Sequence, residues 1–192
     1  MGRLILIRHG ESEGNRDRVF TLTPDVPLTD VGRTQVSAAA EWVATRYRPS
    51  EIVSSPFLRA RQTAAILADR LALGVRIEED LREQSYGGLA GQPYATLRGT
   101  DYDPGSYWLW RPPGGGETLV EVAARAGAAL DRVAASAPAA DLVVVSHGGV
   151  MMALWQHVTG DWLQGRVARN AGLVVVEHLG GRWCGATAIE EG

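Results

Sequence analysis

Short aliphatic runs alternate along this chain with longer stretches in which apolar residues recur at helical spacing. The aliphatic runs predict strands at 3–7, 52–53, 75–77 and 142–145, and a terminal hairpin of 173–176 and 182–189 across Gly180-Gly181. The helical stretches cover about 29–48, 58–73, 117–136 and 147–157, with Thr29 as a helix N-cap. Residues 84–116 are rich in Gly, Pro and aromatic residues, which predicts irregular structure.

The order of these elements predicts an α/β fold. The predicted strands at 3–7 and 142–145 contain the unbroken aliphatic runs 4–7 and 142–145, which are typical of parallel strands covered on both faces. We therefore expect a three-layer α/β/α sandwich around a mostly parallel central sheet. The chain has 192 residues without an internal repeat or a low-complexity linker, so a single domain over 1–192 is expected.

Polar and chemically reactive residues follow three of the predicted strands. Arg8-His9 follows the first strand, Ser54-Ser55 the second, and Ser146-His147 the strand at 142–145. Ligands of open α/β sheets bind outside the carboxyl ends of the strands. The sequence therefore predicts a site at this edge of the sheet, with two histidines beside it.

Composition narrows the chemistry of such a site. All 19 cationic residues are Arg, so neither a Walker-type phosphate loop nor a Schiff-base lysine exists here. The net charge of −3 argues against a nucleic-acid surface. No apolar run approaches the ~20 residues of a membrane span, and the single Cys184 favours a reducing compartment. We expect a cytoplasmic protein with no membrane or nucleic-acid partner; a homodimer is left open.

His9 has two interpretations. It lies directly after a buried strand and beside Arg8, and Gly10 allows a ligand to approach closely. Arg8 can bind a phosphate through two hydrogen bonds, and its charge favours a neutral, nucleophilic imidazole. The alternative is a histidine that only caps the strand by hydrogen bonding, which is the favoured interpretation for an isolated Arg-His-Gly tripeptide.

Further candidates share this ambiguity. Arg59 lies near a helix start, where free N–H groups bind anions, but it can also be a solvated helix residue. His147 follows another strand and can be a capping histidine, and Glu83, which follows the strand at 75–77, can be a surface carboxylate. His157 and His178 match no motif; we interpret both as structural, and their positions do not suggest a metal site.

Four stretches, taken in order, resemble motifs of the histidine phosphatase superfamily, the fold group of the cofactor-dependent phosphoglycerate mutases. LIRHGESEGN resembles the opening nucleophile motif, and SSPFLRARQTA resembles the stretch with the second phosphate-binding Arg. VVVSHGGVM resembles the second-histidine motif, and GGGET at 114–118 resembles the element that opens the long helix. One pattern alone is weak evidence, but four in this order at strand ends argue against coincidence.

The resemblance implies a role for each candidate. His9 would attack phosphorus and carry the phosphoryl group as phosphohistidine, while Glu83 would protonate the leaving oxygen and then act as a base on water. The implied phosphate-binding residues are Arg8, Asn15, Arg59, His147 and Gly148, of which Arg8, Arg59 and His147 would also stabilise the transition state. Because Arg and His charges take the place of a metal, neither a metal nor another cofactor is expected.

Departures from the mutase pattern favour hydrolysis. LREQSYGGLAG at 81–91 resembles LNERHYGGLQG of the mutases, but Gln84 replaces an Arg and Tyr94 replaces a Lys. Arg111 stands alone where the mutases carry an Arg pair. Those cations grip the carboxylate and the second phosphate of the mutase substrate, so we expect a metal-independent phosphomonoesterase acting on a small phosphate ester. The alternatives are a cofactor-dependent phosphoglycerate mutase and a non-catalytic phospho-ligand binding protein on the same fold.

Aromatic residues concentrate within the segment 84–116. They are Tyr94, Tyr102, Tyr107, Trp108 and Trp110. In one interpretation they only pack the loop onto the body of the protein. In the other they form a lid over the site, which would suit an apolar or ring-bearing ester.

Overall fold

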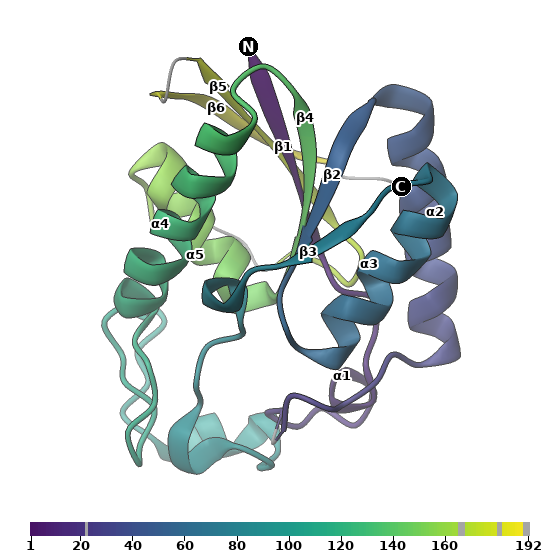
Figure 1. Cartoon of the computed structure of the whole chain (residues 1–192). Helices are drawn as coiled ribbons and strands as arrows, with labels where there is room; N and C mark the ends of the chain where they lie inside the picture. The colour runs from purple at the N-terminus through teal and green to yellow at the C-terminus, as the bar shows by residue number, and fades with distance from the viewer. Residues whose placement is uncertain (22, 165–167, 180–181, 190–192) are drawn as a thin grey trace.

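The computed structural model describes residues 1–21, 23–164, 168–179 and 182–189. Within these residues, six strands form one sheet in the order β3-β2-β4-β1-β5-β6 (Figure 1). The strands are β1 (Gly2–Arg8), β2 (Pro49–Ser54), β3 (Val75–Ile77), β4 (Asp141–Ser146), β5 (Leu173–Leu179) and β6 (Arg182–Ile189). The helices are α1 (Glu13–Arg16), α2 (Asp30–Arg46), α3 (Leu58–Leu71), α4 (Leu119–Ser136) and α5 (Gly148–Thr159).

The sheet is parallel except at one edge. Strand β1 pairs with β4 and β2 pairs with both β3 and β4, all in parallel. Strand β5 is antiparallel to β1 and to β6, so β5 and β6 form the expected terminal pair. Residues 180–181, predicted to join them, lie outside the described residues. The predicted mostly parallel central sheet is confirmed.

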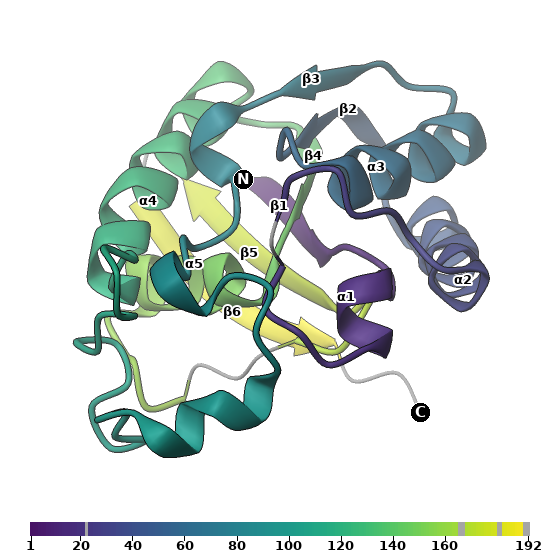
Figure 2. The same ribbon diagram turned by 90° about the horizontal axis from the view of Figure 1, so that it is seen from below.

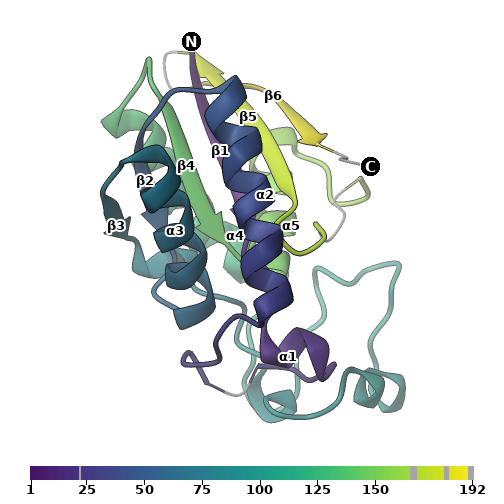
Figure 3. The same ribbon diagram turned by 90° about the vertical axis from the view of Figure 1, so that its right-hand side faces the viewer.

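Helices cover both faces of the sheet. Helices α2 and α3 lie on one face, and α4 and α5 lie on the other (Figures 2 and 3). Alternate residues of β1 pack into different layers: Leu4 and Leu6 join the cluster with α4 and α5, and Ile5 and Ile7 join the cluster with α2 and α3. Residues 4–7 of this strand are all apolar because both faces of the strand are buried there.

Helix ends follow from local chemistry. Thr29 is the N-cap of α2, as predicted, and its hydroxyl oxygen accepts a hydrogen bond from the N–H of Gly32 at 3.0 Å. Helix α3 ends at Leu71, short of the predicted residue 73, because Ala72 adopts the left-handed conformation at φ 55°. The short α1 was not predicted; Ser12 caps it in a reciprocal pair with Asn15.

The segment 84–116 contains only short 3₁₀ helices, at Gly87–Leu89 and Tyr94–Gly99. It crosses the lower end of the molecule, below the carboxyl ends of the parallel strands (Figures 1 and 2). None of the described helices is long and apolar enough to cross a lipid bilayer.

Candidate active site

His9 is held immediately after β1 with one ring nitrogen available for chemistry. Its backbone N–H donates to the carbonyl of Ser146 at 2.9 Å, and the residue is only 2% exposed. Nδ1 lies 2.7 Å from the carbonyl oxygen of Gly10, which can only accept, so Nδ1 carries the proton. Nε2 therefore keeps its lone pair, toward which Nε of Arg59 donates at 3.1 Å. The ring does hydrogen-bond its neighbour, and this bond selects the tautomer in which Nε2 is unprotonated.

A cavity of about 590 Å³ opens beside His9. Of the predicted site residues, those lining it are Arg8, His9, Asn15, Arg59, Glu83 and Gly148. His147 lies behind this surface, with its ring centroid 5.2 Å from that of His9. The fold thus brings together all seven residues that the sequence singled out, from four separate stretches of the chain.

Arg59 is buried, contrary to its interpretation as a solvated helix residue. It lies one residue into α3 and is 1% exposed, whereas Arg61 on the same helix is exposed. Its guanidinium carbon lies 5.1 Å from the ring centre of Phe57. The helix turns Arg59 inward because α3 packs on the sheet with that face.

His147 is the N-cap residue of α5, but its side chain makes no capping hydrogen bond. Instead, Nε2 lies 2.7 Å from the hydroxyl oxygen of Ser55. That oxygen already accepts from the N–H of Phe57 at 3.3 Å, so its own hydrogen is free to donate to Nε2. When the hydroxyl donates in this way, His147 carries its proton on Nδ1, which lies 3.9 Å from Glu83 Oε2. The position of Ser55 at a strand end was the sequence signal for this contact.

Three buried donor nitrogens around His9 have no hydrogen-bond partner among the described residues. They are Nε of Arg8, Nη1 of Arg59 and Nδ1 of His147. A buried donor without a partner is costly, and native structures usually satisfy it. All three belong to residues expected to hold phosphate, so an oxyanion in the cavity would supply the missing acceptors.

Burial and charge set the ionisation of the site. Burial, followed by the charges of Arg59 and Arg8, lowers the pKa of His9 well below its usual range. Burial, Arg59 and the neighbouring His9 lower the pKa of His147 in the same way. Burial raises the pKa of Glu83, although Arg59 opposes this rise. The site therefore favours neutral imidazoles and a protonated carboxyl group.

Glu83 reaches the cavity from an irregular stretch. It follows a 3₁₀ turn at Glu79–Leu81, not strand β3 directly, because Glu78 caps that turn after the strand ends. Its Oε1 accepts the N–H of Gln84 at 2.9 Å, and its side chain is 10% exposed. A Cβ added at Gly149 would lie 3.1 Å from Oε1, so the glycine-rich start of α5 lets the carboxyl group approach closely. The interpretation as a surface carboxylate is wrong.

Asn15 is tied into the site by a residue that sequence reasoning missed. Asn170 donates from Nδ2 to Oδ1 of Asn15 at 2.9 Å and to the carbonyl of His9 at 3.3 Å. Nearby, Nη1 of Arg8 donates to the carbonyl of Ala168 at 2.6 Å. Neither Ala168 nor Asn170 belongs to a motif, and only the fold brings the loop before β5 beside the loop after β1.

The positions that distinguish the mutases do not offer cations to this cavity. Gln84 lines the cavity, but its Nε2 donates to the carbonyl of Glu117 at 2.6 Å. Arg111 pairs with Glu121 at 2.6 Å and is not among the lining residues. Tyr94 contributes its hydroxyl, 3.4 Å from Nδ2 of Asn15.

The site also contains a group of metal-ligand type. Ligand atoms of His9, Glu83 and His147 lie within 4.8 Å of one another. However, Nε2 of His9 already accepts from Arg59, and Arg8 and Arg59 place two positive charges beside the group. Such surroundings repel a cation and attract an anion, so the residues present fit phosphate better than a metal ion.

Aromatic side chains form much of the cavity wall. The lining includes Phe20, Tyr86, Tyr94, Tyr102, Tyr107 and Trp110. Trp108 instead stacks on Trp162, with ring centroids 5.9 Å apart and planes at 7°. Tyr107 also donates its hydroxyl to the carbonyl of Trp162 at 2.7 Å. Some aromatics of the loop thus line the cavity while others hold the loop on the body.

Comparisons with known proteins agree with one another. The model of the histidine phosphatase superfamily (branch 1) matches residues 4–187. A glucosyl-3-phosphoglycerate phosphatase from Mycobacterium tuberculosis (strain ATCC 25618 / H37Rv) is 39% identical over 166 residues, covering 79% of this chain and 73% of that protein. A metal-independent phosphoserine phosphatase from Arabidopsis thaliana is 30% identical over 188 residues, covering 94% and 78%. The structure of a mycobacterial glucosyl-3-phosphoglycerate phosphatase with VO3 superposes with a TM-score of 0.84 at 32% identity, covering 95% of this chain and 96% of that one.

Proposed function

The chain belongs to the histidine phosphatase superfamily and is a phosphomonoesterase, and on that premise we propose that it works through a phosphohistidine on His9. The observation that carries this proposal is the set of partnerless buried donors on Arg8, Arg59 and His147 around the free Nε2 of His9. Together they would hold three phosphoryl oxygens while leaving phosphorus open to in-line attack.

The first half of the reaction transfers the phosphoryl group to the protein. Nε2 of His9 forms a bond to phosphorus as the ester P–O bond breaks. Burial raises the pKa of Glu83 and so favours its protonated form, which gives its proton to the departing alkoxide oxygen. The alcohol leaves. The donor nitrogens of Arg8, Arg59 and His147 hold the phosphoryl oxygens and stabilise their negative charge.

The second half returns the protein to its starting state. Glu83, now ionised, takes a proton from water as the water oxygen attacks phosphorus. The N–P bond breaks, Nε2 of His9 recovers its lone pair, and inorganic phosphate leaves. We propose that no metal takes part, because the guanidinium and imidazole donors supply the charge that a metal would bring.

The substrate is a small phosphate ester whose alcohol carries a ring. The support for this is the aromatic wall of the cavity, with Phe20, Tyr102 and Trp110 among its members. Arg18 also lines the cavity, which favours an anionic group on the alcohol. A phosphate-release panel should therefore include glucosyl-3-phosphoglycerate and phosphoserine, the substrates named for the relatives, beside simple aryl and sugar phosphates.

We also propose the segment 84–116 as a lid within one catalytic domain over 1–192, because several of its residues line the cavity. A cytoplasmic location suits a chain whose single cysteine, Cys184, is exposed and has no second cysteine to pair with.

Replacing the nucleophile tests the mechanism. We expect His9→Ala to lower the rate of aryl phosphate hydrolysis by at least about 10³-fold, because the variant has no atom to carry the phosphoryl group. The matched control is His157→Gln, since His157 pairs with Asp131 and does not line the cavity. Chromogenic assay of both variants, with and without a chelator, gives the answer. Wild-type turnover by His9→Ala, or loss of wild-type activity on chelation, would refute the proposal.

A phosphorylated protein intermediate distinguishes this function from simple binding. Rapid quenching during turnover should trap phosphate on the wild-type chain and none on His9→Ala. Ligand binding without phosphate release across the panel would instead support the non-catalytic alternative. Interconversion of phosphoglycerates dependent on a bisphosphoglycerate would support the mutase.

A further inference from the structure

A partly buried ion pair, Arg125 with Glu117, lies beside the proposed proton donor and outside the cavity. We propose that Arg125 and Glu117 are positioning residues that hold the backbone around Glu83, and so set how efficiently Glu83 protonates the leaving group. Neither residue lines the cavity. The inference rests on the proposed role of Glu83 as the general acid.

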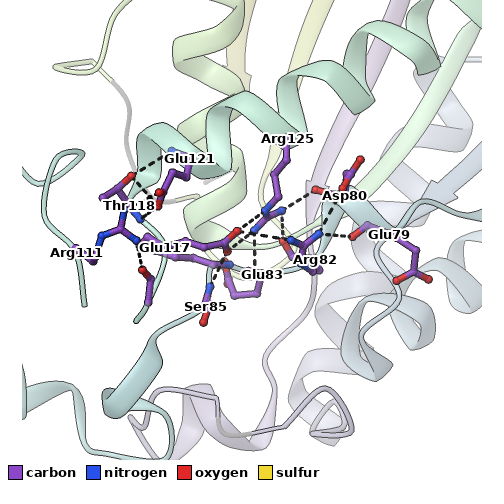
Figure 4. Close-up of polar contacts among 12 residues, drawn as sticks. Glu79, Asp80, Arg82, Glu83, Ser85, Arg111, Glu117, Thr118, Glu121 and Arg125 are labelled. Atoms are coloured by element: carbon purple, nitrogen blue, oxygen red, sulfur yellow. Dashed lines mark hydrogen bonds and ion pairs between the residues drawn. The ribbon is translucent and has the colours of Figure 1, made fainter. Parts of the chain in front are cut away.

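Arg125 forms hydrogen bonds with the backbone before Glu83 and at Glu83 itself. It lies on α4 and its side chain is only 11% exposed. Nη1 donates to the carbonyls of Asp80 at 2.7 Å and Arg82 at 2.9 Å, and Nη2 donates to the carbonyl of Glu83 at 3.2 Å (Figure 4). One guanidinium thus donates hydrogen bonds to three backbone carbonyl oxygens. Among the described residues, these oxygens accept no backbone hydrogen bond within a helix or a sheet.

Glu117 forms hydrogen bonds with the two residues that follow Glu83. Its carboxylate accepts Nε and Nη2 of Arg125, both at 2.8 Å, and also the N–H of Ser85 at 2.9 Å (Figure 4). Its backbone N–H donates to the carbonyl of Ser85 at 2.9 Å, and its carbonyl accepts from Gln84. The backbone is therefore held by hydrogen bonds on both sides of Glu83, and the Glu83 side chain lines the cavity.

The pair is charged and joined by two hydrogen bonds. Burial opposes ionisation of Glu117, but the hydrogen bonds from Arg125 and the N–H of Ser85 outweigh it and lower the pKa of the carboxyl group. Charge-assisted, bidentate bonds of this kind are stronger and more directional than neutral ones. Glu117 lies directly before the N-cap Thr118, and Arg125 lies in the second turn of α4, so the start of one helix places both anchors.

A second arginine of α4 does not make the same contacts. Arg132 also lies on α4, and it contacts the carboxylates of Glu78 and Asp80 at 2.9 and 3.0 Å. Its side chain is 54% exposed, and no described hydrogen bond joins it to a backbone carbonyl of the segment. Solvent-exposed pairs contribute little, so Arg132 is a matched control.

Esters whose leaving groups differ in basicity distinguish a misplaced general acid from a general loss of activity. An alkoxide needs a proton as it departs, whereas 4-nitrophenolate departs without one. The ratio kcat/KM covers only the steps through release of the alcohol, so the later role of Glu83 toward water does not enter. A carboxyl group misplaced by about 1 Å can cost ~10²-fold in rate.

The experiment measures kcat/KM for an alkyl phosphate and for 4-nitrophenyl phosphate in Arg125→Gln and Glu117→Gln. We expect each variant to lose about 10²-fold on the alkyl ester and less than about threefold on the aryl ester. Arg125→Lys, which keeps the charge but not the fork of donors, should lie between Arg125→Gln and wild type. Arg132→Gln should match wild type on both esters.

The outcomes distinguish this inference from the proposed function. Glu83→Gln should show the same selective loss on the alkyl ester; if it slows both esters equally, the acid role of Glu83 fails. If Glu83→Gln is selective but the Arg125 and Glu117 variants slow both esters equally, or neither, the positioning role is overturned. Glu117→Gln preserves the shape of the side chain, so it remains informative if Arg125→Gln does not fold.

Discussion

At the scale of single residues, reactivity is assigned by neighbours that can only donate or only accept. The carbonyl of Gly10 places the proton of His9 on Nδ1, and Arg59 can only donate to Nε2. The Ser55 hydroxyl, which can both donate and accept, lies 2.7 Å from Nε2 of His147. The protonation pattern of His9 is thus set by atoms that are not themselves reactive.

The pH dependence follows from the pKa directions of two groups. His9 must be neutral and Glu83 protonated, and burial moves the pKa of His9 down and that of Glu83 up. On an alkyl ester, we expect the rate ratio of wild type to Glu83→Gln to be highest on the acidic side and to fall as pH rises through the raised pKa of Glu83. Using the ratio cancels the ionisation of the substrate. A ratio that rises with pH would contradict the assignment of Glu83 as the acid.

At the scale of elements, the loop after β1 is held against the start of α2. The backbone N–H of Thr29 donates to the carbonyl of Glu11 at 2.9 Å, and its hydroxyl donates to Glu11 Oε1 at 2.7 Å. Gly10 lies so close to α2 that an added Cβ would fall 2.4 Å from the carbonyl oxygen of Gly32. Gly10 is therefore required for the packing of the loop that carries His9.

A pair of glycine substitutions tests this packing. We expect Gly10→Ala to lower the free energy of unfolding by about 1–3 kcal/mol, because the new methyl group meets backbone that cannot move aside freely. Gly74→Ala is the control, since nothing lies within 4 Å of its added Cβ, and should change stability by no more than about 0.5 kcal/mol. Urea unfolding measures both. Equal effects of the two substitutions would show that the loop adapts.

At the scale of the whole molecule, strand order assembles the site. Strands β2, β4 and β1 are neighbours in the sheet, so Ser55, His147 and His9 emerge side by side at their carboxyl ends. The segment 84–116 connects the two layers of helices and passes below this edge (Figure 1). Its Trp108 stacks on Trp162, which joins it to the segment after α5.

The aromatic wall of the cavity gives a prediction about substrate binding. Trp110 lines the cavity and packs edge-on against Tyr102 at 5.2 Å, and its Nε1 donates to Asp101. We expect Trp110→Ala to raise KM for an aryl phosphate about three- to tenfold, since an aromatic pair contributes about 1 kcal/mol. Leu109→Ala serves as the control because Leu109 is exposed and does not line the cavity. Steady-state kinetics measure KM for both variants. An unchanged KM in Trp110→Ala would show that the substrate does not contact Trp110.

Much of this arrangement could be predicted along the chain. Apolar runs located β1 and β4 within a residue or two, and Thr29 marked the start of α2. His9, Arg59 and His147 belong to local motifs at strand ends, so their gathering followed from the parallel sheet. Asn170 carries no comparable signal. Glu117 belongs to the GGGET stretch, but nothing in that stretch indicates that Glu117 and Arg125 contact the backbone around Glu83, because those contacts lie across large separations in the chain.

The amino-acid sequence by itself determined the α/β architecture, the family and the set of reactive side chains, because those depend on apolar periodicity and on short motifs. Only the tertiary structure decided which nitrogen of His9 is free, that Arg59 is buried, and what anchors Glu83. The physical reason is that tautomers, burial and pKa values depend on neighbours brought together by folding. The proposed role of Glu83 as an acid depends on its surroundings, which raise the pKa of its carboxyl group, and its place in the chain does not reveal them.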